Sequence, residues 1–145
     1  FFYVRFGSAL NFDSLSITRR EDLATASLEL FKTNPLTGIG LNNFIPRLVN
    51  LPTIVGPNRF LQPVHNIFLL TLSETGIIGS IGLLLLIVFP LIKLWSKRSE
   101  PFSKLLLGLW ATIIFLGMFD HYFLTSPQGL RLLFLIWGLS FARHL

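Results

Sequence analysis

The pattern of hydrophobic and polar positions divides the chain into a mixed N-terminal half and an apolar C-terminal half. A helix that crosses a membrane needs about 20 mostly apolar residues. Residues 76–95 read GIIGSIGLLLLIVFPLIKLW, with no charged residue before Lys93. Residues 103–120 and 129–142 are shorter, largely apolar stretches, and the long side chain of Arg131 can reach the membrane interface. The pattern therefore predicts three transmembrane helices.

Upstream of these spans, residues 19–33 show the pattern of an amphipathic helix. Thr18 and Glu21 have the spacing of a capping box at its start, and apolar residues then recur at i, i+3, i+7 and i+8. Asn34-Pro35 should end the helix, because proline disfavours helical geometry in the residue before it. This helix is too polar to span, so we expect it on the outer membrane surface or against the helical bundle.

The next segment, residues 36–64, has no regular period and contains four prolines. Loops of this length are usually functional or disordered, and the many apolar residues argue against disorder. We therefore expect an ordered lid or cavity wall. The predicted fold class is all-α: a polytopic helical membrane bundle with a long extracytoplasmic loop that carries the amphipathic helix.

The helix that begins near Asn66 raises a question of length. Residues 67–95 would extend about 43 Å, against a hydrocarbon core of about 30 Å. Either the first turns rise above the membrane or the helix is strongly tilted. Glu74 favours the first alternative, which places His65 near the mouth of the bundle. Small residues offer a smooth face for close helix packing: Gly76, Gly79, Ser80 and Gly82.

Composition agrees with a membrane protein. Of 145 residues, 52% are hydrophobic and 13% are charged, against roughly 25% charged in soluble domains. Residues 1–6 have no initiator Met and read as the end of a spanning helix cut by a fragment boundary. The absence of cysteine excludes disulfides and thiolate chemistry. The net charge is +5, but the basic residues are scattered among apolar spans, so nucleic acid is not expected as a partner.

Orientation follows from the short loops. Four basic residues crowd the connection 96–104 and its edges, opposed only by Glu100, so this loop should be cytoplasmic: Lys93, Lys97, Arg98 and Lys104. Alternation then places residues 7–66 and 120–128 outside the cytoplasm and the C-terminus inside. Residues 67–145 form the three-helix membrane part in this scheme.

Arg19 and Arg20 are unusual at a predicted helix N-terminus, because the helix macrodipole favours anions there. A phosphate or pyrophosphate in front of that end would remove the conflict, since backbone N–H groups and guanidinium groups would both bind it. The alternative is that the two arginines pair with Asp13, Asp22 or lipid phosphates.

His65 is the candidate general base, because histidine accepts protons near neutral pH; a hydrogen-bonded structural role is the alternative. Asn66 can cap the helix that follows. Arg47 and Arg59 can each add positive charge to a polyanion site or stay solvated. Asp120 can pair with His65 or an arginine, or belong to a plain interfacial turn.

Several kinds of site are missing from the sequence. The three histidines do not have metal-ligand spacing, and no carboxylate cluster resembles a divalent-cation site. No phosphate-binding loop, no Gly-x-Ser-x-Gly elbow and no glycosidase-like carboxylate pair occurs. The sequence thus predicts no metal and no cofactor, and chemistry carried by arginine and histidine.

The order of these motifs resembles the superfamily of O-antigen ligases, O-antigen polymerases and protein-glycosylation enzymes, over roughly residues 17–142. The motifs are Arg20-Glu-Asp-Leu-Ala-Thr-Ala, Asn34-Pro-Leu-Thr-Gly-Ile-Gly-Leu-Asn-Asn-Phe44, His65-Asn66, Glu74-Thr-Gly-Ile-Ile-Gly79, Asp120-His121-Tyr122 and Pro127-Gln128-Gly129. Family members often carry Trp four residues after the arginine. Here Ala24 or Leu23 holds that place, so Arg20 and Arg19 both stay candidates. A further family arginine should lie upstream of Phe1.

The resemblance implies a glycosyltransferase of the bacterial cytoplasmic (inner) membrane. It would move a glycan from an undecaprenyl-diphosphate carrier to a hydroxyl of a glycan or lipid-core acceptor, without a metal. His65 would take the acceptor proton or orient the hydroxyl, and the bundle would hold the polyprenyl tail among the membrane lipids. Three arginines would hold the diphosphate: Arg20, Arg19 and Arg59. Three further residues would support the site: Asn66, Glu74 and Asp120.

Other hypotheses remain beside the enzyme. A transport or permease component for a small anion or a lipid-linked sugar would use ionisable residues or broken helices near mid-membrane. The predicted spans are nearly free of charge at their centres, which favours surface chemistry over transport. A fragment without autonomous function is a third hypothesis. The sequence does not distinguish between a ligase, a polymerase and a protein-glycosylation enzyme, because it does not identify the acceptor.

Overall fold

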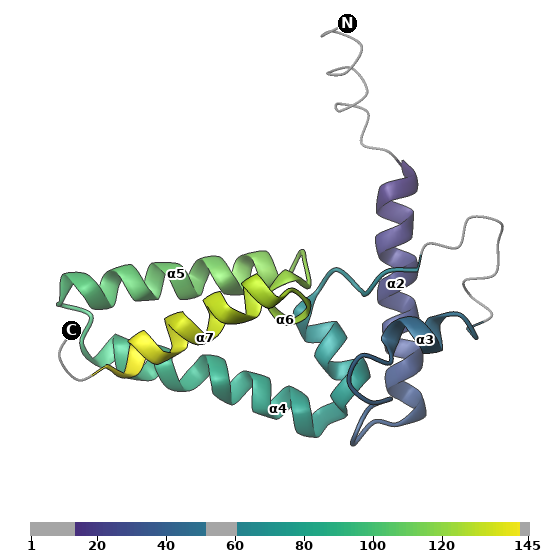
Figure 1. Cartoon of the computed structure of the whole chain (residues 1–145), viewed down its shortest axis with the longest axis horizontal. Helices are drawn as coiled ribbons and strands as arrows, with labels where there is room; N and C mark the ends of the chain where they lie inside the picture. Colours follow the sequence, from purple (N-terminus) through teal and green to yellow (C-terminus); the bar gives the residue numbers. More distant parts are fainter. Residues whose placement is uncertain (1–13, 52–60, 143–145) are drawn as a thin grey trace, which may run out of the picture.

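The computed structural model describes residues 14–51 and 61–142, and this part of the chain is helical, without strands (Figure 1). The all-α expectation is thereby confirmed for the described residues. The helices are α2 (Ser14–Thr33), α3 (Phe44–Leu48), α4 (Ile67–Ser96), α5 (Pro101–Gly117), α6 (Tyr122–Thr125) and α7 (Pro127–Phe141).

Three apolar helices, α4, α5 and α7, lie side by side in one bundle (Figure 1). Their shared core contains Trp110, which is fully buried and donates its indole N–H to Ser140 Oγ at 3.1 Å. Among the described helices, α4 is long and apolar enough to cross a membrane, and α5 is a shorter apolar helix. Only 22% of the most apolar window of α4 is buried. Its surface is therefore unlike that of the core helix of a soluble protein, which would be mostly covered.

The predicted start of the amphipathic helix is wrong by five residues. Helix α2 begins at Ser14, not at 19, and Thr18 lies inside it. A capping box requires a non-helical residue at the N-cap, and residues 14–18 contain no glycine or proline to interrupt the helix. Arg19 and Arg20 are consequently not at a helix N-terminus, and an anion site made of free N–H groups at that point is excluded. The end of α2 at Thr33, before Asn34-Pro35, is as expected.

A sharp break at Gly76 resolves the length problem of α4. Gly76 has φ 64° and ψ −162°, far from helical values. Residues 67–75 therefore form an arm that points in a different direction from residues 77–96 of the same helix (Figure 1). The remaining 20 residues, 77–96, extend about 30 Å, which is the thickness of a hydrocarbon core.

Four backbone groups next to this break find partners in the loop after α2. A continuous helix would bond the N–H groups of Ile77 and Ile78 to the carbonyls of Ser73 and Glu74. The Ser73 and Glu74 carbonyls instead accept from Ile39 N and Gly40 N, at 3.0 and 2.8 Å. The Ile77 and Ile78 N–H groups donate to the Pro35 and Leu36 carbonyls, at 2.9 and 3.2 Å. Four loop bonds thus replace two helical ones.

Among the described residues, the closest contacts at two glycines of the expected smooth face of α4 do not come from a neighbouring helix. A Cβ added to Gly82 would meet no atom within 4 Å, and one added to Gly79 would meet Thr75 of the same helix. Gly76 serves the loop contact instead. The close approach between helices is made by Gly117 of α5, where a Cβ would lie 2.5 Å from Ile67 Cδ1 at the start of α4.

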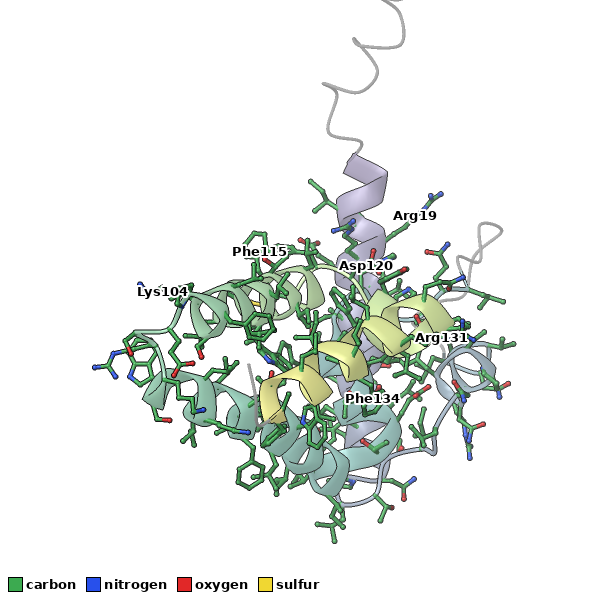
Figure 2. The ribbon with its side chains drawn as sticks, turned by 60° about the vertical axis from the view of Figure 1, so that its left-hand side comes forward. Arg19, Lys104, Phe115, Asp120, Arg131 and Phe134 are labelled. Carbon is green, nitrogen blue, oxygen red and sulfur yellow. The ribbon has the colours of Figure 1, made fainter. Side chains whose placement is uncertain are left out.

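Helix α2 lies crosswise to the bundle and packs against the N-terminal arm of α4 (Figures 1 and 2). Its apolar stripe forms a second core with α3 and residues near the start of α4: Leu23, Ala26, Leu30, Ile39, Phe44, Leu48, Val64 and Leu70. Buried Ser27 adds a polar link, because its hydroxyl donates to the Leu69 carbonyl at 2.8 Å. The described parts of the loop, residues 36–51 and 61–64, thus contribute apolar residues to a core with α2, and residues 52–60 lie outside the described residues.

Candidate functional site

Asn66 joins the start of α4 to the end of α5. Its side-chain oxygen accepts from Phe68 N and Leu69 N at 2.9 and 3.0 Å, which confirms the predicted N-cap. Its amide nitrogen donates to the Met118 carbonyl at 3.1 Å. The same side chain therefore caps one helix and holds the last turn of another, and it brings the residue before it beside the residues that follow Met118.

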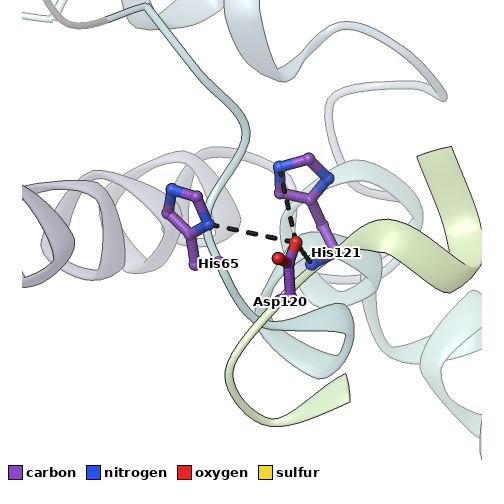
Figure 3. A group of neighbouring side chains, drawn as sticks. All are labelled: His65, Asp120 and His121. Atoms are coloured by element: carbon purple, nitrogen blue, oxygen red, sulfur yellow. Dashed lines mark hydrogen bonds and ion pairs between the residues drawn. The ribbon is translucent and has the colours of Figure 1, made fainter. Parts of the chain in front are cut away.

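These residues form a compact polar group, His65, Asp120 and His121 (Figure 3). Asp120 Oδ1 lies 4.0 Å from His65 Nδ1 and 4.0 Å from His121 Nε2. The two imidazole rings have centroids 5.3 Å apart. At 4.0 Å, Asp120 Oδ1 and His65 Nδ1 are neighbours beyond hydrogen-bond distance, and the same oxygen accepts from His121 N at 2.6 Å, so the pairing of Asp120 with His65 stays a prediction.

The group is half enclosed. The side chains of His65 and His121 are about one-fifth exposed, at 21% and 20%, whereas Asp120 is 57% exposed. Burial lowers the pKa of His121 below its usual 6.5; the Asp120 carboxylate acts against this, and His65 adds to it. His65 Nδ1 is buried and has no hydrogen-bond partner among the residues that the structure describes. A small inward movement of Asp120 would satisfy it, and hydrogen bonds of catalytic groups are often long before substrate binds.

The arginines fall into different environments. On α2, Arg19 stands four residues before Leu23 and seven before Ala26, so it lies in line with the packed stripe, and it is partly buried. Arg20 is exposed. Figure 2 shows Arg19 near the N-terminal end of α2. Arg47 is exposed on the short helix α3, and Arg59 lies outside the described residues.

Glu74 is buried and supports the backbone of the loop. Its carboxylate accepts from Phe44 N at 3.1 Å, at the start of α3, and its own carbonyl accepts from Gly40 N. Gly38 approaches so closely that an added Cβ would lie 2.3 Å from the Glu74 carbonyl carbon. The two glycine-containing motifs of the sequence are therefore the two halves of one backbone junction, and Glu74 is part of it.

Sequence reasoning did not assign His121 to the site. The spacing of the histidines predicted no metal site, yet the fold places one ligand atom from each of His65, Asp120 and His121 within 4.8 Å of the others. Positions 65 and 120 are 55 residues apart in the sequence, so no local spacing connects them. The adjacency of Asp120 and His121 was the one available signal.

Comparison with known proteins places the chain in a family. The family model described as O-antigen ligase matches residues 2–84, more than half of the chain. The matched stretch includes α2, the loop junction and His65, and it ends before Asp120. No curated protein and no solved structure matches the chain. The O-antigen ligases are integral membrane proteins that act on lipid-linked glycans. On the motif order and this match, the chain belongs to the O-antigen ligase family.

Proposed function

We propose that this protein transfers a glycan from an undecaprenyl-diphosphate carrier to a hydroxyl of a glycan or lipid-core acceptor, by a mechanism that needs no metal. Family membership supports the ligase or polymerase class of reaction. The observation that carries the mechanism is the placement of Asp120 Oδ1 4.0 Å from His65 Nδ1. A carboxylate on one ring nitrogen leaves the other nitrogen available as a base.

The proton transfer follows from this arrangement. Asp120 holds the Nδ1–H tautomer of His65, and His65 Nε2 takes the proton of the acceptor hydroxyl as its oxygen attacks the anomeric carbon. The bond between that carbon and the carrier phosphate oxygen breaks, and the electron pair leaves with the diphosphate. Asp120 stabilises the imidazolium that forms, as the carboxylate does in other base–carboxylate pairs.

The leaving group needs positive charge. Arg19 is our first choice for binding the diphosphate, because it lies in line with the packed face of α2, and Arg20 is the second. Val64 packs into the same core as α2, so the backbone just before His65 is held against that helix. Guanidinium groups bind phosphate in a bidentate manner and would balance the charge that develops as the diphosphate leaves. Arg59 remains a third candidate on sequence grounds alone.

The membrane orientation completes the proposal. Helices α4, α5 and α7 would cross the inner membrane with the Lys93–Lys104 end in the cytoplasm, because basic residues gather there. Figure 2 shows Lys104 at the end of α5 opposite to Asp120. His65 and Asp120 would then lie on the outer side, with residues 7–66 and 120–128 extracytoplasmic. The crosswise direction of α2 fits a helix that lies along the membrane surface.

The polyprenyl tail has a fitting place on α4. A groove of about 190 Å³ follows both sides of the kink, and its lining is almost wholly apolar: Phe68, Leu69, Leu72, Ser80, Leu83 and Leu84. Helix α4 is mostly uncovered, so lipid would have access to it. An isoprenoid chain that lay in this groove would bring its diphosphate toward the outer end of the bundle.

The transport alternative has one observation in its favour, the broken helix at Gly76, because transporters bind substrates at helix breaks. In those proteins the freed backbone groups line a cavity. Here four of these groups, the Ser73 and Glu74 carbonyls and the Ile77 and Ile78 N–H groups, are bonded to residues 35–40, so they are not available to an ion. We therefore place transport second.

The test is glycan transfer by the purified full-length protein in nanodiscs, with lipid-linked donor and acceptor. His65→Ala should lower kcat by about 10²–10⁴-fold, the usual contribution of a general base. Asp120→Asn should lower kcat and leave the KM for the donor nearly unchanged, because it changes the base and not the diphosphate site. Glu100→Gln, at the other end of the bundle, is the matched control and should transfer normally. If His65→Ala is present at the normal protein amount and has the kcat of the wild type, His65 is not the general base.

A further inference from the structure

The group of His65, Asp120 and His121 has the composition and the size of a transition-metal site. Its three ligand atoms form a triangle with sides between 4.0 and 4.8 Å. An ion at its centre would stand about 2.3–2.5 Å from each atom, against about 2.0–2.2 Å for zinc bound to histidine nitrogen and carboxylate oxygen. A contraction of a few tenths of an ångström would therefore close the site, and Asp120 is exposed enough to move.

The hydrogen bonds of His121 prepare one of its nitrogens as a ligand. In the tautomer that carries the proton on His121 Nδ1, this N–H donates to Thr125 Oγ1 at 2.6 Å, and the Thr125 hydroxyl donates to the His121 carbonyl at 3.1 Å. In this tautomer His121 Nε2 carries a lone pair, and Asp120 Oδ1, which also accepts from His121 N at 2.6 Å, lies 4.0 Å from it. A lone pair that faces an anionic oxygen calls for a cation between them. A partner on the second nitrogen of a metal-binding histidine is the usual second-shell arrangement.

His65 supplies a second, independent indication. Its Nδ1 is buried, faces the same carboxylate oxygen and has no hydrogen-bond partner within residues 14–51 and 61–142. Buried polar atoms of native proteins are nearly always satisfied by a protein group, a water or an ion. A cation at the centre of the group would satisfy both histidines and Asp120 together.

We propose that His65, Asp120 and His121 bind one divalent transition-metal ion of the zinc class, and that the bound ion switches the transferase off. Two imidazoles and one carboxylate suit zinc and disfavour magnesium, which prefers oxygen ligands. The ion binds through His65 Nδ1, Asp120 Oδ1 and His121 Nε2, and a water fills the fourth position on the exposed side.

Inhibition follows from the tautomer of His65 and rests on the base role proposed above. When a metal occupies Nδ1, the neutral ring carries its proton on Nε2, so Nε2 can no longer accept the proton of the acceptor hydroxyl. The ion also takes Asp120 away from His65. Metal binding and base catalysis at His65 therefore exclude each other.

The first experiment measures binding alone. The full-length protein in nanodiscs, freed of metal, is titrated with Co²⁺, followed by visible absorption, and then with Zn²⁺ in competition. We expect one ion per protein and at least a tenfold loss of affinity in His121→Gln and Asp120→Asn. Thr125→Val, which leaves every ligand in place, should weaken binding by about 10–100-fold through the orientation of His121. Glu100→Gln should bind as wild type. Absent Co²⁺ bands, or equal affinity in wild type, His121→Gln and Thr125→Val, would overturn the site.

The second experiment measures the ratio of transfer rates with and without Zn²⁺ for each protein, so that basal differences cancel. Wild type and Glu100→Gln should lose transfer with zinc and regain it with a chelator, whereas His121→Gln should keep most of its rate. Mg²⁺ at the same concentration should have no effect. Equal zinc inhibition of wild type and His121→Gln would overturn the switch. Transfer that does not depend on His65 would refute the base role, and the cobalt titration would still decide the metal site.

Discussion

The junction between the loop after α2 and the break in α4 makes a strong prediction about Gly38. Its φ is +68°, and a Cβ at this position would lie 2.3–2.4 Å from backbone atoms of Glu74 and Thr75. An alanine in this left-handed conformation costs about 1–2 kcal/mol. The clashing atoms are backbone, so they cannot turn aside as a side chain would, and the loop has to move away from α4.

That movement separates Ile39 N from the Ser73 carbonyl and Gly40 N from the Glu74 carbonyl. Each lost bond costs about 1 kcal/mol, and more where the carbonyl stays buried without a partner. Together with the backbone strain, Gly38→Ala should destabilise the fold by about 3–5 kcal/mol. Gly76→Ala should behave similarly, because its φ is +64° and its Cβ would lie 2.4 Å from the Leu36 carbonyl oxygen.

Gly82→Ala is the matched control on the same helix. Gly82 has helical geometry, and a Cβ there would meet nothing within 4 Å, so alanine should be neutral or stabilising by up to about 1 kcal/mol. The assay is equilibrium unfolding of the purified protein in mixed micelles with increasing SDS. If Gly38→Ala and Gly82→Ala unfold within about 1 kcal/mol of each other, the backbone junction does not stabilise the protein as described.

Three further predictions concern the outer end of the bundle. Asn66→Ala should cost about 1 kcal/mol of stability for the lost N-cap and should also lower transfer. Asn66→Asp should keep the cap and the stability but lose the bond to Met118, so it should lower transfer only. Parallel unfolding and transfer assays separate the two effects, and full activity of both variants would contradict the positioning role. The pKa of His121 should lie below 6.5 in NMR titrations, and Asp120→Asn should lower it further by removing the carboxylate that raises it. Because the folded pKa is below the unfolded one, this group should reduce stability as the pH falls below about 6.5, and a higher His121 pKa in Asp120→Asn would contradict the electrostatic account. Leu72→Trp should partly fill the apolar groove on α4 and raise the KM for the long-chain donor several-fold with kcat little changed; an unchanged KM would argue against the groove as the binding place of the tail.

Much of the helical architecture could be read from local features. The apolar runs predicted the helices of the bundle, because a continuous apolar surface has few other stable arrangements in a membrane. Asn34-Pro35 correctly marked the end of α2, and Asn66 correctly marked the cap of α4. Each of these features acts through bonds within a few residues, so a single stretch of chain contains all the information that it needs.

The start of α2 could not be read in this way. The Thr18–Glu21 spacing satisfies a capping box, but the same residues are also acceptable inside a helix, and the residues from Ser14 onward continue it. With that shift, the arginines lost their predicted place at a helix terminus. In the structure, Arg19 lies in line with the packed face of α2 and Arg20 is exposed. This difference depends on which side of α2 meets the rest of the protein.

The break at Gly76 and the histidine group needed the folded chain for a common reason. A helix can open at Gly76 only if other backbone groups replace its lost bonds, and those groups come from residues 35–40, more than thirty positions away. Likewise, His65 meets Asp120 and His121 only because Asn66 bonds the end of α5 and Gly117 lets α5 approach Ile67. The local sequence determines which hydrogen bonds form within a few residues and how apolar residues repeat along a helix, whereas contacts between distant segments arise only when the helices pack.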